Sequence, residues 1–473
     1  MPPNFLVILT DQQRYDQMGY SSGGHFETAN LDRLAASGTI FENAYTFAPI
    51  CIPSRGSLLT GCAPCRFPTV APRLEALREG WWTIGHALRG AGYQTMLAGK
   101  MHMHPIRAWH GFDQMRMAEH LGLVYGPEQF DDYTRWLVSK GKGDWRATHI
   151  FGPEEKQQRD EWRMQQQAMP FYYPRQYHPT DWVAREASEM LAKRKADQPY
   201  FMIMSFPHPH SPFDPPAPYS TMYKEEDAIL PKDGVEVNDG LPPSVRELMS
   251  STKSFGTVLT EKLDKQLQRR MATYIRALIR QIDDGIGEVL KQVDLSNTVV
   301  FFTTDHGDYY GHRGRMLKTP GVPFDDVARV PTFCCGPGIT AGRREKNPVQ
   351  GADFVPTFLD IAGIGSPARD LLDTRSLLPA LRDGKPDESR TVYCDSNYDW
   401  PMVRRGNLKY FRHRKNGEEM LFDLEADPGE TRNLAADAAY AARRDALKEA
   451  LASLEARPAP DLPTFPMPAN WRA

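Results

Sequence analysis

The sequence predicts an α/β protein in which helices sandwich a large, mixed and mostly parallel sheet. Short apolar segments rich in β-branched and aromatic residues alternate with longer segments of helical period. The apolar segments lack the alternation of a strand with one wet face, which is typical of a sheet buried on both faces. At 473 residues, the chain is long enough for one large domain, expected over residues 1–370, and a smaller C-terminal α+β subdomain with an extended tail over residues 371–473.

We expect four buried strands, at residues 5–9, 94–98, 200–205 and 298–303, because each apolar run is too short for a helix. Helices are expected between them at residues 83–89, at residues 181–193 with Thr180 as the N-cap, and at residues 263–293. Strands that alternate with helices favour parallel pairing. In the last helix, apolar residues recur on one face: Leu263, Leu267, Met271, Tyr274, Leu278, Ile282, Ile286 and Val293.

Composition argues against two classes of partner. The 57 basic and 60 acidic residues nearly balance, with a formal net charge of -3, so no strong positive field favours nucleic acid or an anionic membrane surface. No apolar run approaches the length of a membrane span, and the N-terminal segment lacks the basic start and long apolar core of a secretory signal. We therefore expect a cytoplasmic protein without nucleic-acid or membrane partners.

The cysteines are too sparse for a disulfide framework, and we expect most of them to be reduced. Cys62 and Cys65 form a C-x-x-C pair, but no second pair stands at zinc-finger spacing. Buried free cysteines that act as small apolar residues are the alternative for this pair. The six cysteines are Cys51, Cys62, Cys65, Cys334, Cys335 and Cys394.

Acidic motifs follow two of the predicted strands. Asp11 and Gln12 come directly after the first strand, and Asp305 and His306 come after the strand at residues 298–303. Ligands of open α/β sheets bind outside the carboxyl ends of the strands, so these groups are expected to converge. Their oxygens and nitrogen suit a hard divalent cation. The alternative is that the acids cap a loop or form a turn.

Basic residues follow the other strands. Lys100 and His102 come after the second strand, two residues apart, so an extended tip directs both to one pocket. A Pro-rich loop after the third strand presents His208 and His210, and Lys318 lies in a Gly-rich loop after Asp305. Each of these residues, taken alone, is more often a solvated or locally satisfied side chain.

Cys51 stands at an expected helix start, in the segment Cys51-Ile52-Pro53-Ser54-Arg55. A helix N-terminus offers free N–H donors and the positive end of the dipole, so an anion can dock beside this thiol. Arg55 follows four residues later, which puts it on the same helical face. The pattern indicates a reactive site rather than core packing.

Taken in order, these segments resemble the sulfatase family. Residues 51–61 match its Cys-x-Pro-Ser-Arg-x-x-Leu-Leu-Thr-Gly signature, and residues 92–102 match its Gly-Tyr-x-Thr-x-x-x-Gly-Lys-x-His signature. The Pro-His-x-Pro loop, Asp305-His306-Gly307 and Lys318 follow, and residues 420–435 are similar to the family's closing hairpin and loop. Two departures are Ile52, where a small residue is usual, and Met101, where tryptophan is common. Residues 99–102 and 207–210 are also similar to choline sulfatases.

The resemblance implies an alkaline-phosphatase-like fold and the release of inorganic sulfate and an alcohol or phenol from a small-molecule sulfate monoester. It implies that a formylglycine-generating enzyme oxidises Cys51 to formylglycine, whose hydrate is the nucleophile. It further implies a divalent cation, calcium foremost with manganese or magnesium as alternatives, held by Asp11, Gln12, Asp305, His306 and modified Cys51. The roles implied for the remaining residues are charge neutralisation by Arg55, substrate binding and catalysis by Lys100, His210 and Lys318, and proton transfer by His102. His208 and His312 are expected to be structural supports.

Three rival functions remain open. A phosphonate monoester or phosphodiester hydrolase of the same superfamily typically lacks the Lys100 and His102 pair, and a phosphotransferase of the alkaline-phosphatase type requires Ser or Thr at position 51. An inactive binding protein would not need all of these polar residues to be present.

Residues 125–177 are predicted to be irregular and aromatic-rich, and we expect this segment to be a lid, an oligomer contact or a packed structural excursion. As a lid, the aromatic residues of this segment are expected to form a wall for an aryl group or a cage for a quaternary ammonium. The tail at residues 457–473 is expected to clasp a neighbouring subunit of a homo-oligomer.

Overall fold

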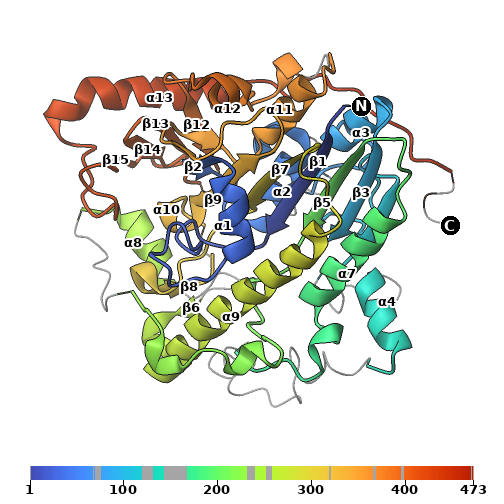
Figure 1. The fold of residues 1–473 in the computed structure, drawn as a ribbon. Coiled ribbons are helices and arrows are strands. Elements are labelled where there is room, and N and C mark those ends of the chain that lie inside the picture. Colours follow the sequence, from blue (N-terminus) through green and yellow to red (C-terminus); the bar gives the residue numbers. More distant parts are fainter. Residues whose placement is uncertain are drawn as a thin grey trace.

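The computed structural model describes residues 2–67, 69, 76–119, 131–142, 168–231, 240–251, 258–318, 321–365, 369–395, 399–469 and 471. Its centre is a nine-stranded sheet in the order β10-β2-β9-β7-β1-β5-β3-β4, with β11 paired to β2 (Figure 1). Its strands are β1 (Asn4–Thr10), β2 (Gly38–Tyr45), β3 (Gln94–Gly99), β4 (Gln114–Met117), β5 (Tyr200–Ser205), β7 (Thr298–Thr304), β9 (Arg329–Cys335), β10 (Arg343–Glu345) and β11 (Val349–Gln350). Among these strands β9 alone runs antiparallel to its neighbours. The predicted mixed, mostly parallel sheet and its four predicted strands are confirmed.

Helices cover both faces of this sheet (Figure 1). Along β1, Phe5 and Val7 pack toward one face, and Leu6 and Ile8 toward the other, because successive side chains of a strand alternate. The first face is covered by α2 (Cys51–Thr60), α3 (Ile84–Gly90), α11 (Phe354–Ile361) and α12 (Leu378–Asp383). The second face is covered by α1 (Ala29–Ala36), α4 (Asp132–Ser139), α7 (Pro179–Ala192) and α9 (Lys265–Leu290). Strands buried on both sides explain the uninterrupted apolar runs.

The predicted helices form, with shifted ends. α3 is capped by the Thr83 side chain, and α9 begins after Asp264, whose carboxylate accepts the Leu267 N–H. All eight apolar residues predicted for one face of α9 and its flanks are buried. The prediction of Thr180 as the N-cap of α7 is wrong: the helix begins at Pro179 after His178, since proline is well suited to the first helical position.

The segment predicted to be irregular contains a helix. α4 (Asp132–Ser139) starts after Asp131, whose side chain accepts the Thr134 N–H, and it packs Tyr133 and Leu137 into the core. The indole ring of Trp136 in this helix lies against the ring of Tyr177. The rest of this segment that the structure describes, residues 168–177, has no α-helix, and residues 125–130 and 143–167 lie outside the described residues.

A smaller antiparallel sheet follows in the order β12-β13-β14-β15. Its strands are β12 (Thr391–Cys394), β13 (Met402–Arg405), β14 (Leu408–Arg412) and β15 (Glu419–Asp423). Helix α13 (Ala441–Glu455) buries Leu447 and Leu451 against it. The short elements β6 (Val258–Leu259), β8 (Arg315–Met316), α8 (Pro243–Ser250) and α10 (Asp325–Ala328) complete the fold. A C-terminal α+β subdomain is thus confirmed, and the boundary at residue 370 stays a prediction.

The C-terminal tail packs on its own chain. The Phe465 N–H donates to the Gly80 carbonyl at 2.6 Å, and Thr464 forms a β-bridge with Trp81. Farther along, the indole N–H of Trp471 donates to the Arg107 carbonyl at 3.0 Å. The described residues of the tail thus pack against residues around positions 80 and 107 of their own chain, and a contact with a neighbouring subunit stays a prediction.

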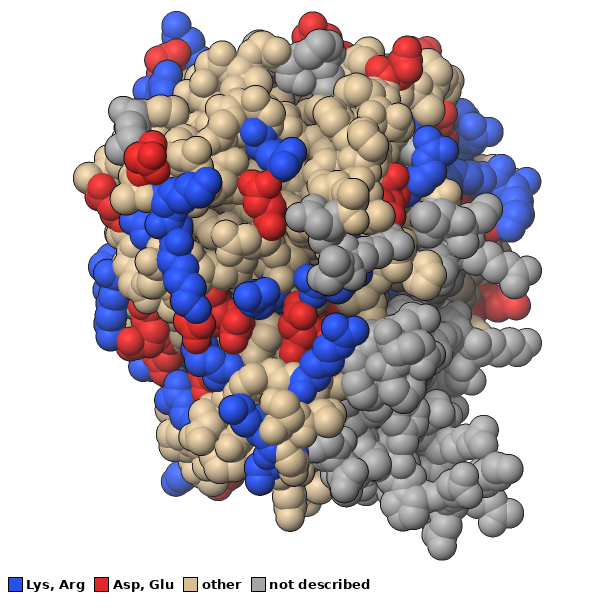
Figure 2. Space-filling view, turned by 90° about the vertical axis from the view of Figure 1, so that its right-hand side faces the viewer, with Lys and Arg blue, Asp and Glu red and all other residues tan. Residues whose placement is uncertain are grey.

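Charges of both signs are mixed over the surface. On the face in Figure 2, Lys and Arg side chains lie close to Asp and Glu side chains over much of the described surface. This distribution matches the near balance of charge in the sequence. Within the described part of the chain, no helix combines the length and apolar character that a membrane span requires.

Replacement of Lys409 by methionine is expected to lower the free energy of unfolding by about 3 to 5 kcal/mol. The Lys409 ammonium is fully buried between Asp325 at 2.7 Å and Glu430 at 2.8 Å, so methionine removes the cation that lies between these two buried carboxylates. Urea unfolding measures the change. Lys448→Met is the control, because Lys448 and its partner Glu419 are partly exposed and such pairs contribute about 1 kcal/mol or less. Equal losses in both variants would contradict the prediction.

Candidate active site

The predicted polar residues converge at one edge of the large sheet. Strands β7, β1, β5 and β3 are parallel neighbours, so their carboxyl ends meet on the same side. The loops that leave these ends carry Asp305, Asp11, His210 and Lys100. Helix α2 begins at Cys51 beside them, as predicted, with no side chain capping its N-terminus among the described residues.

Four potential metal ligands form a buried cluster. One donor atom from each of Asp11, Cys51, Asp305 and His306 lies within 4.8 Å of the others. The Cys51 Sγ atom is 3.0 Å from His306 Nε2 and 3.8 Å from Asp11 Oδ1. Residues almost three hundred positions apart in the sequence are thus brought together, as the prediction requires.

Arg55 holds the two carboxylates from the other side. Its Nε donates to Asp305 Oδ2 at 2.8 Å, and its Nη2 donates to Asp11 Oδ2 at 2.9 Å. Its Nη1 donates to the Lys100 carbonyl at 2.7 Å and to Ser205 Oγ at 3.0 Å. The guanidinium is buried and every one of its nitrogens is engaged, so it fixes the ends of the four strands β1, β3, β5 and β7 relative to α2.

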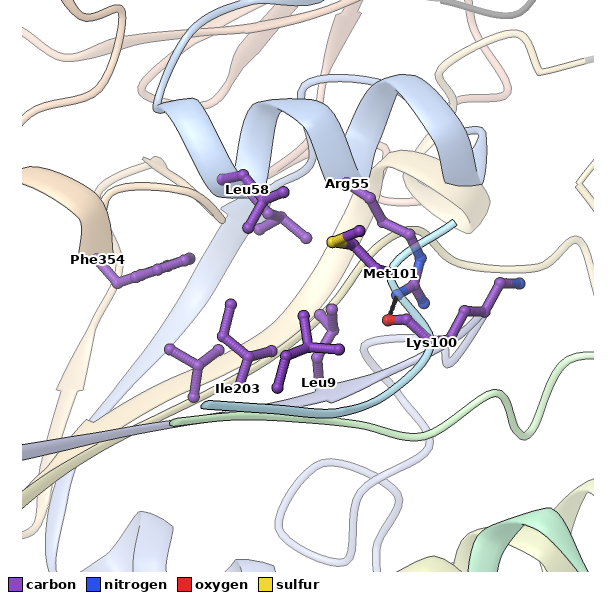
Figure 3. A pocket seen from close by; sticks show the side chains of 10 residues that line it. Leu9, Arg55, Leu58, Lys100, Met101, Ile203 and Phe354 are labelled. Atoms are coloured by element: carbon purple, nitrogen blue, oxygen red, sulfur yellow. Dashed lines mark hydrogen bonds between the residues drawn. The ribbon is translucent and has the colours of Figure 1, made fainter. Parts of the chain in front are cut away.

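An apolar layer supports Arg55. Figure 3 shows the side chain descending from α2 to the Lys100 carbonyl, with Met101 beside it. Leu58, Ile203 and Phe354 line the neighbouring space. Met101, a departure from the usual tryptophan, is buried in this layer. The low-polarity surroundings strengthen the ion pairs that Arg55 forms.

Lys100 forms a second ion pair with Asp11. Its Nζ lies 2.6 Å from Asp11 Oδ2, and both side chains are buried. Burial by itself raises the pKa of Asp11, but Lys100, His210, Arg55 and His306 hold it well below its ordinary value. Burial also lowers the pKa of Lys100, but Asp11 and Cys51 raise it above its ordinary value. Both groups are therefore charged at neutral pH.

His306 directs one ring nitrogen into the cluster. Its Nδ1 lies 2.9 Å from the Gly307 carbonyl, which can only accept, so Nδ1 carries a proton and Nε2 faces Cys51. Burial lowers the pKa of His306, but Asp305 and Cys51 raise it above its ordinary value. Burial and Asp11 raise the pKa of the Cys51 thiol, but Lys318, His306 and Lys100 lower it more, and the pKa lies below its ordinary value. The cysteine is poised toward the thiolate.

The donor set fits a hard divalent cation. Asp11 Oδ2 and Asp305 Oδ2 are taken by Arg55, while Asp305 Oδ1 accepts the N–H groups of Gln12 and His306 at 3.0 and 2.9 Å. These contacts orient the carboxylates, as supporting contacts orient metal ligands. Carboxylate oxygens with one imidazole suit calcium, magnesium or manganese.

Gln12 lies beside this cluster, with its side-chain amide engaged on the outer side. Its Oε1 accepts from Lys318 Nζ at 2.9 Å, and its Nε2 donates to Asp308 Oδ2 at 2.5 Å. Its role as a ligand stays a prediction. Asp308 also accepts the N–H groups of Tyr310 and Leu317 through Oδ1, and so supports the loop before Lys318. The position of Asp308 in the segment Asp305-His306-Gly307-Asp308 was the sequence signal for its supporting role.

Lys318 and His210 form a pair. Lys318 Nζ lies 2.7 Å from His210 Nε2, and His210 Nδ1 lies 2.7 Å from the Ser211 carbonyl. The carbonyl places the ring proton on Nδ1, so Nε2 accepts from Lys318. Lys318 is half-buried rather than a solvated surface lysine. These two residues come from loops 108 positions apart and face the site as a unit.

His102 joins the site from the loop after β3. It has a φ of 60°, and its Nδ1 is buried without a hydrogen bond to any described residue. Burial, with Lys100 and Arg55, holds the pKa of His102 well below its ordinary value, so the ring is neutral at neutral pH. Beneath it lies Glu119, which the sequence analysis missed. Its only signal was an acid shortly after a strand.

His208 and His312 lie outside the cluster. His208 Nε2 and His178 Nε2 both face Asp214 Oδ1, at 3.2 and 3.5 Å, with their rings stacked. His208 and Asp214 belong to the same loop as His210, between β5 and residue 219. His312 Nδ1 lies 3.8 Å from Asp326. Both arrangements fit a supporting role, which stays a prediction.

The remaining cysteines are free thiols. Cys62 is buried, and burial raises its pKa to about 12. Cys65 has an exposed side chain, but partial desolvation raises its pKa to about 11. Neither has the lowered pKa of Cys51. Their environment is that of unreactive thiols.

Comparison with known proteins assigns this geometry to a family. Residues 3–364 match the family described as Sulfatase, and residues 322–457 match the family described as N-sulphoglucosamine sulphohydrolase, C-terminal. An arylsulfatase of Clostridium perfringens is 34% identical over 477 residues, covering 95% of this chain and 94% of the relative. A choline-sulfatase of Rhizobium meliloti is 28% identical over 447 residues, covering 92% and 82%. In fold, the chain is similar to a phosphonate monoester hydrolase of Silicibacter pomeroyi, with a TM-score of 0.77, 23% identity, and coverage of 95% and 94%.

Proposed function

The chain belongs to the sulfatase family and is a sulfuric ester hydrolase, and we propose that it releases sulfate from small-molecule sulfate monoesters at Cys51 after this residue has become formylglycine. The observation that carries the proposal is the position of Cys51 at the start of α2, between a buried hard-donor cluster and three cationic side chains. A sulfate monoester shields its sulfur with anionic oxygens, so a site that hydrolyses it must neutralise that charge.

The proposed cofactors are a divalent cation, calcium foremost, and formylglycine at position 51. Asp11, Asp305 and His306 would hold the cation, with Gln12 and position 51 beside it. When bound, the cation supplies electrostatic stabilisation of the sulfate oxygens, and formylglycine supplies as its hydrate an oxygen nucleophile. A formylglycine-generating enzyme is the proposed partner for maturation.

The protein's own groups bind and orient the sulfate. Arg55 holds the carboxylates of Asp11 and Asp305 in place, and the side chains of Lys100 and Lys318 neutralise the anionic oxygens. Water is excluded because most of these side chains are buried, which strengthens each interaction. Lys318 is hydrogen-bonded to His210, so this pair is positioned to stabilise and protonate the leaving oxygen. The neutral His102 accepts a proton at its buried Nδ1.

The competing activity is phosphonate monoester or phosphodiester hydrolysis. Lys100 and His102 favour sulfate esters, because this pair is typically lacking in those hydrolases. The proposal is tested with protein in which peptide mass analysis verifies the aldehyde at position 51, with added calcium, manganese or magnesium. We expect turnover of 4-nitrophenyl sulfate or choline sulfate and weaker turnover of phenyl phosphonate esters and bis(4-nitrophenyl) phosphate. Loss of preference for sulfate esters would support the competing activity, and no turnover of any sulfate ester would refute the proposal.

Lys318→Ala is expected to slow poor leaving groups more than good ones. General acid assistance is worth roughly 10² to 10⁴-fold and matters most where the leaving oxygen is basic. We expect kcat/KM to fall at least about tenfold more for phenyl sulfate than for 4-nitrophenyl sulfate, as a series of substituted phenyl sulfates measures. His210→Ala is expected to act in the same direction. Lys291→Ala is the control, because Lys291 is an exposed lysine at the end of α9. Equal losses for both leaving groups would assign Lys318 to sulfate binding alone.

A further inference from the structure

Glu119 is a buried carboxylate beneath the loop that carries Lys100 and His102. It follows β4, which pairs in parallel with β3, so both loops leave the same edge of the sheet. Glu119 Oε1 accepts the N–H groups of Met101 and His102 at 3.0 and 2.9 Å, and Oε2 accepts the His102 N–H at 3.0 Å. Both backbone donors at the turn are therefore bound by one side chain.

The turn needs such support because of its backbone conformation. The φ of His102 is 60°, in the left-handed region that residues with a Cβ rarely adopt and that persists only where surrounding contacts determine it. Lys100, at the start of the same turn, is held from the other side. Arg55 donates to its carbonyl, and its side chain forms an ion pair with Asp11. A change at Glu119 therefore moves His102 first and Lys100 second.

Charged groups from the loop after β3 and from α2 lie close to Glu119. Lys100, His102 and Arg55 face its carboxylate, and its own N–H donates to Asp131 Oδ2 at 2.6 Å. Burial raises the pKa of Glu119 to about 7, although the N–H groups of His102 and Met101 and the charges of Lys100 and Arg55 oppose this shift. The ionised form accepts the N–H groups through both oxygens, whereas a protonated oxygen is a donor that faces another donor.

We propose that Glu119 is a positioning residue that fixes the backbone of Met101 and His102 and so holds the His102 ring and Lys100 in their working arrangement. This inference rests on the proposed role of His102 in sulfate ester hydrolysis. In this role Glu119 acts through the backbone of Met101 and His102. Its protonation is expected to weaken the turn and to reduce turnover, with Lys100 and His102 acting as the affected groups.

The test compares Glu119→Gln with a matched control. Glutamine keeps the shape but turns an N–H donor toward the His102 N–H. The control is Glu345→Gln in β10, at the far edge of the sheet, where a buried glutamate likewise accepts a backbone N–H. We expect E119Q to lower kcat/KM about 10 to 100-fold at pH 8, and the ratio of wild-type to variant kcat/KM to shrink between pH 8 and pH 6. E345Q should match the wild type.

Amide hydrogen exchange measures the same contact without activity. Exchange at Met101 and His102 is expected to be at least about tenfold faster in E119Q than in the wild type, with an unchanged melting temperature. Full activity of E119Q, a ratio independent of pH, unchanged exchange, or a loss explained by a lower melting temperature would each overturn the inference. If E119Q does not fold, Glu119→Asp, which keeps the charge but shortens the side chain, is expected to lose activity in the same way, and full activity would overturn the inference.

His102→Ala separates this inference from the function it rests on. If H102A retains the wild-type kcat/KM, the proposed role of His102 fails, and the inference fails with it. If H102A loses activity and E119Q does not, the inference alone fails. Losses in both variants, with faster exchange in E119Q, support both.

Discussion

Cys51→Ala is expected to lower kcat/KM for 4-nitrophenyl sulfate by roughly 10⁴ to 10⁶-fold, the loss that removal of a nucleophile produces. Position 51 is the point where the donor cluster and the cationic residues meet, so alanine removes the reacting group and leaves its surroundings in place. Steady-state kinetics measures the change, on wild-type protein whose aldehyde at position 51 is verified by peptide mass analysis.

Cys65→Ala is the control for this prediction. Cys65 is an exposed thiol with a raised pKa, and its loss is expected to leave kcat/KM within about twofold of the wild type. Cys51→Ser is expected to be as inactive as Cys51→Ala, because serine does not yield the aldehyde. Retention of more than a tenth of the activity in Cys51→Ala would rule out position 51 as the source of the nucleophile.

Arg55→Ala is expected to abolish activity and to lower the free energy of unfolding by about 3 to 5 kcal/mol. Arg55 is buried and pairs with Asp11 and Asp305 at 2.9 and 2.8 Å, so alanine leaves two buried carboxylates facing each other with less compensation. Arg55→Lys keeps the charge but not the planar set of donors, so it is expected to recover only part of both losses. Urea unfolding and sulfate ester kinetics measure them.

The stability loss in Arg55→Ala depends on pH. Burial raises the pKa of Asp11, but Lys100, His210, Arg55 and His306 depress it below its ordinary value in the folded protein. The stabilisation from ionised Asp11 is therefore present above its unfolded pKa and is lost as the pH falls through the folded pKa. The difference between wild type and Arg55→Ala should be largest near pH 7 and smaller at acid pH. A difference that grows on acidification would contradict it.

Arg89→Ala provides the matched control for an ion pair. Arg89 pairs with Asp113 at 2.7 Å, but the two side chains are 46% and 38% exposed, so the loss is expected to stay within about 1 kcal/mol. If Arg55→Ala costs no more than Arg89→Ala, the two carboxylates at the site do not depend on Arg55 for compensation.

Local pattern predicted much of the fold. The four buried strands, the apolar face of α9 and the start of α2 at Cys51 follow from residue type and period. The N-cap of α7 and the helix α4 were missed because caps and short helices depend on a few contacts. His178 and Pro179 begin α7, and Asp131 begins α4 through a bond to the Thr134 N–H. The path of the tail was also missed, because its packing surface lies more than three hundred residues away.

The candidate site divides in the same way. The spacing of four between Cys51 and Arg55 places both on one face of α2, so sequence alone relates them. The engagement of the Gln12 amide by Lys318 and Asp308 was not visible in the sequence, since each contact spans about three hundred residues. Glu119 was missed for a different reason: its partners Met101 and His102 are close in sequence but follow β3, and the pairing of β3 with β4 was not predicted.

By itself, the sequence predicted the candidate site residues and the local element that presents most of them, because helical and strand periods act over a few residues. The tertiary structure decided the order β7-β1-β5-β3, and with it the meeting of Asp11, Cys51, Asp305 and His306. It also decided that Glu119 supports His102. Strand neighbours are chosen by the burial of whole sheet faces and by long-range hydrogen bonds, and neither is encoded in the spacing of residues along the chain.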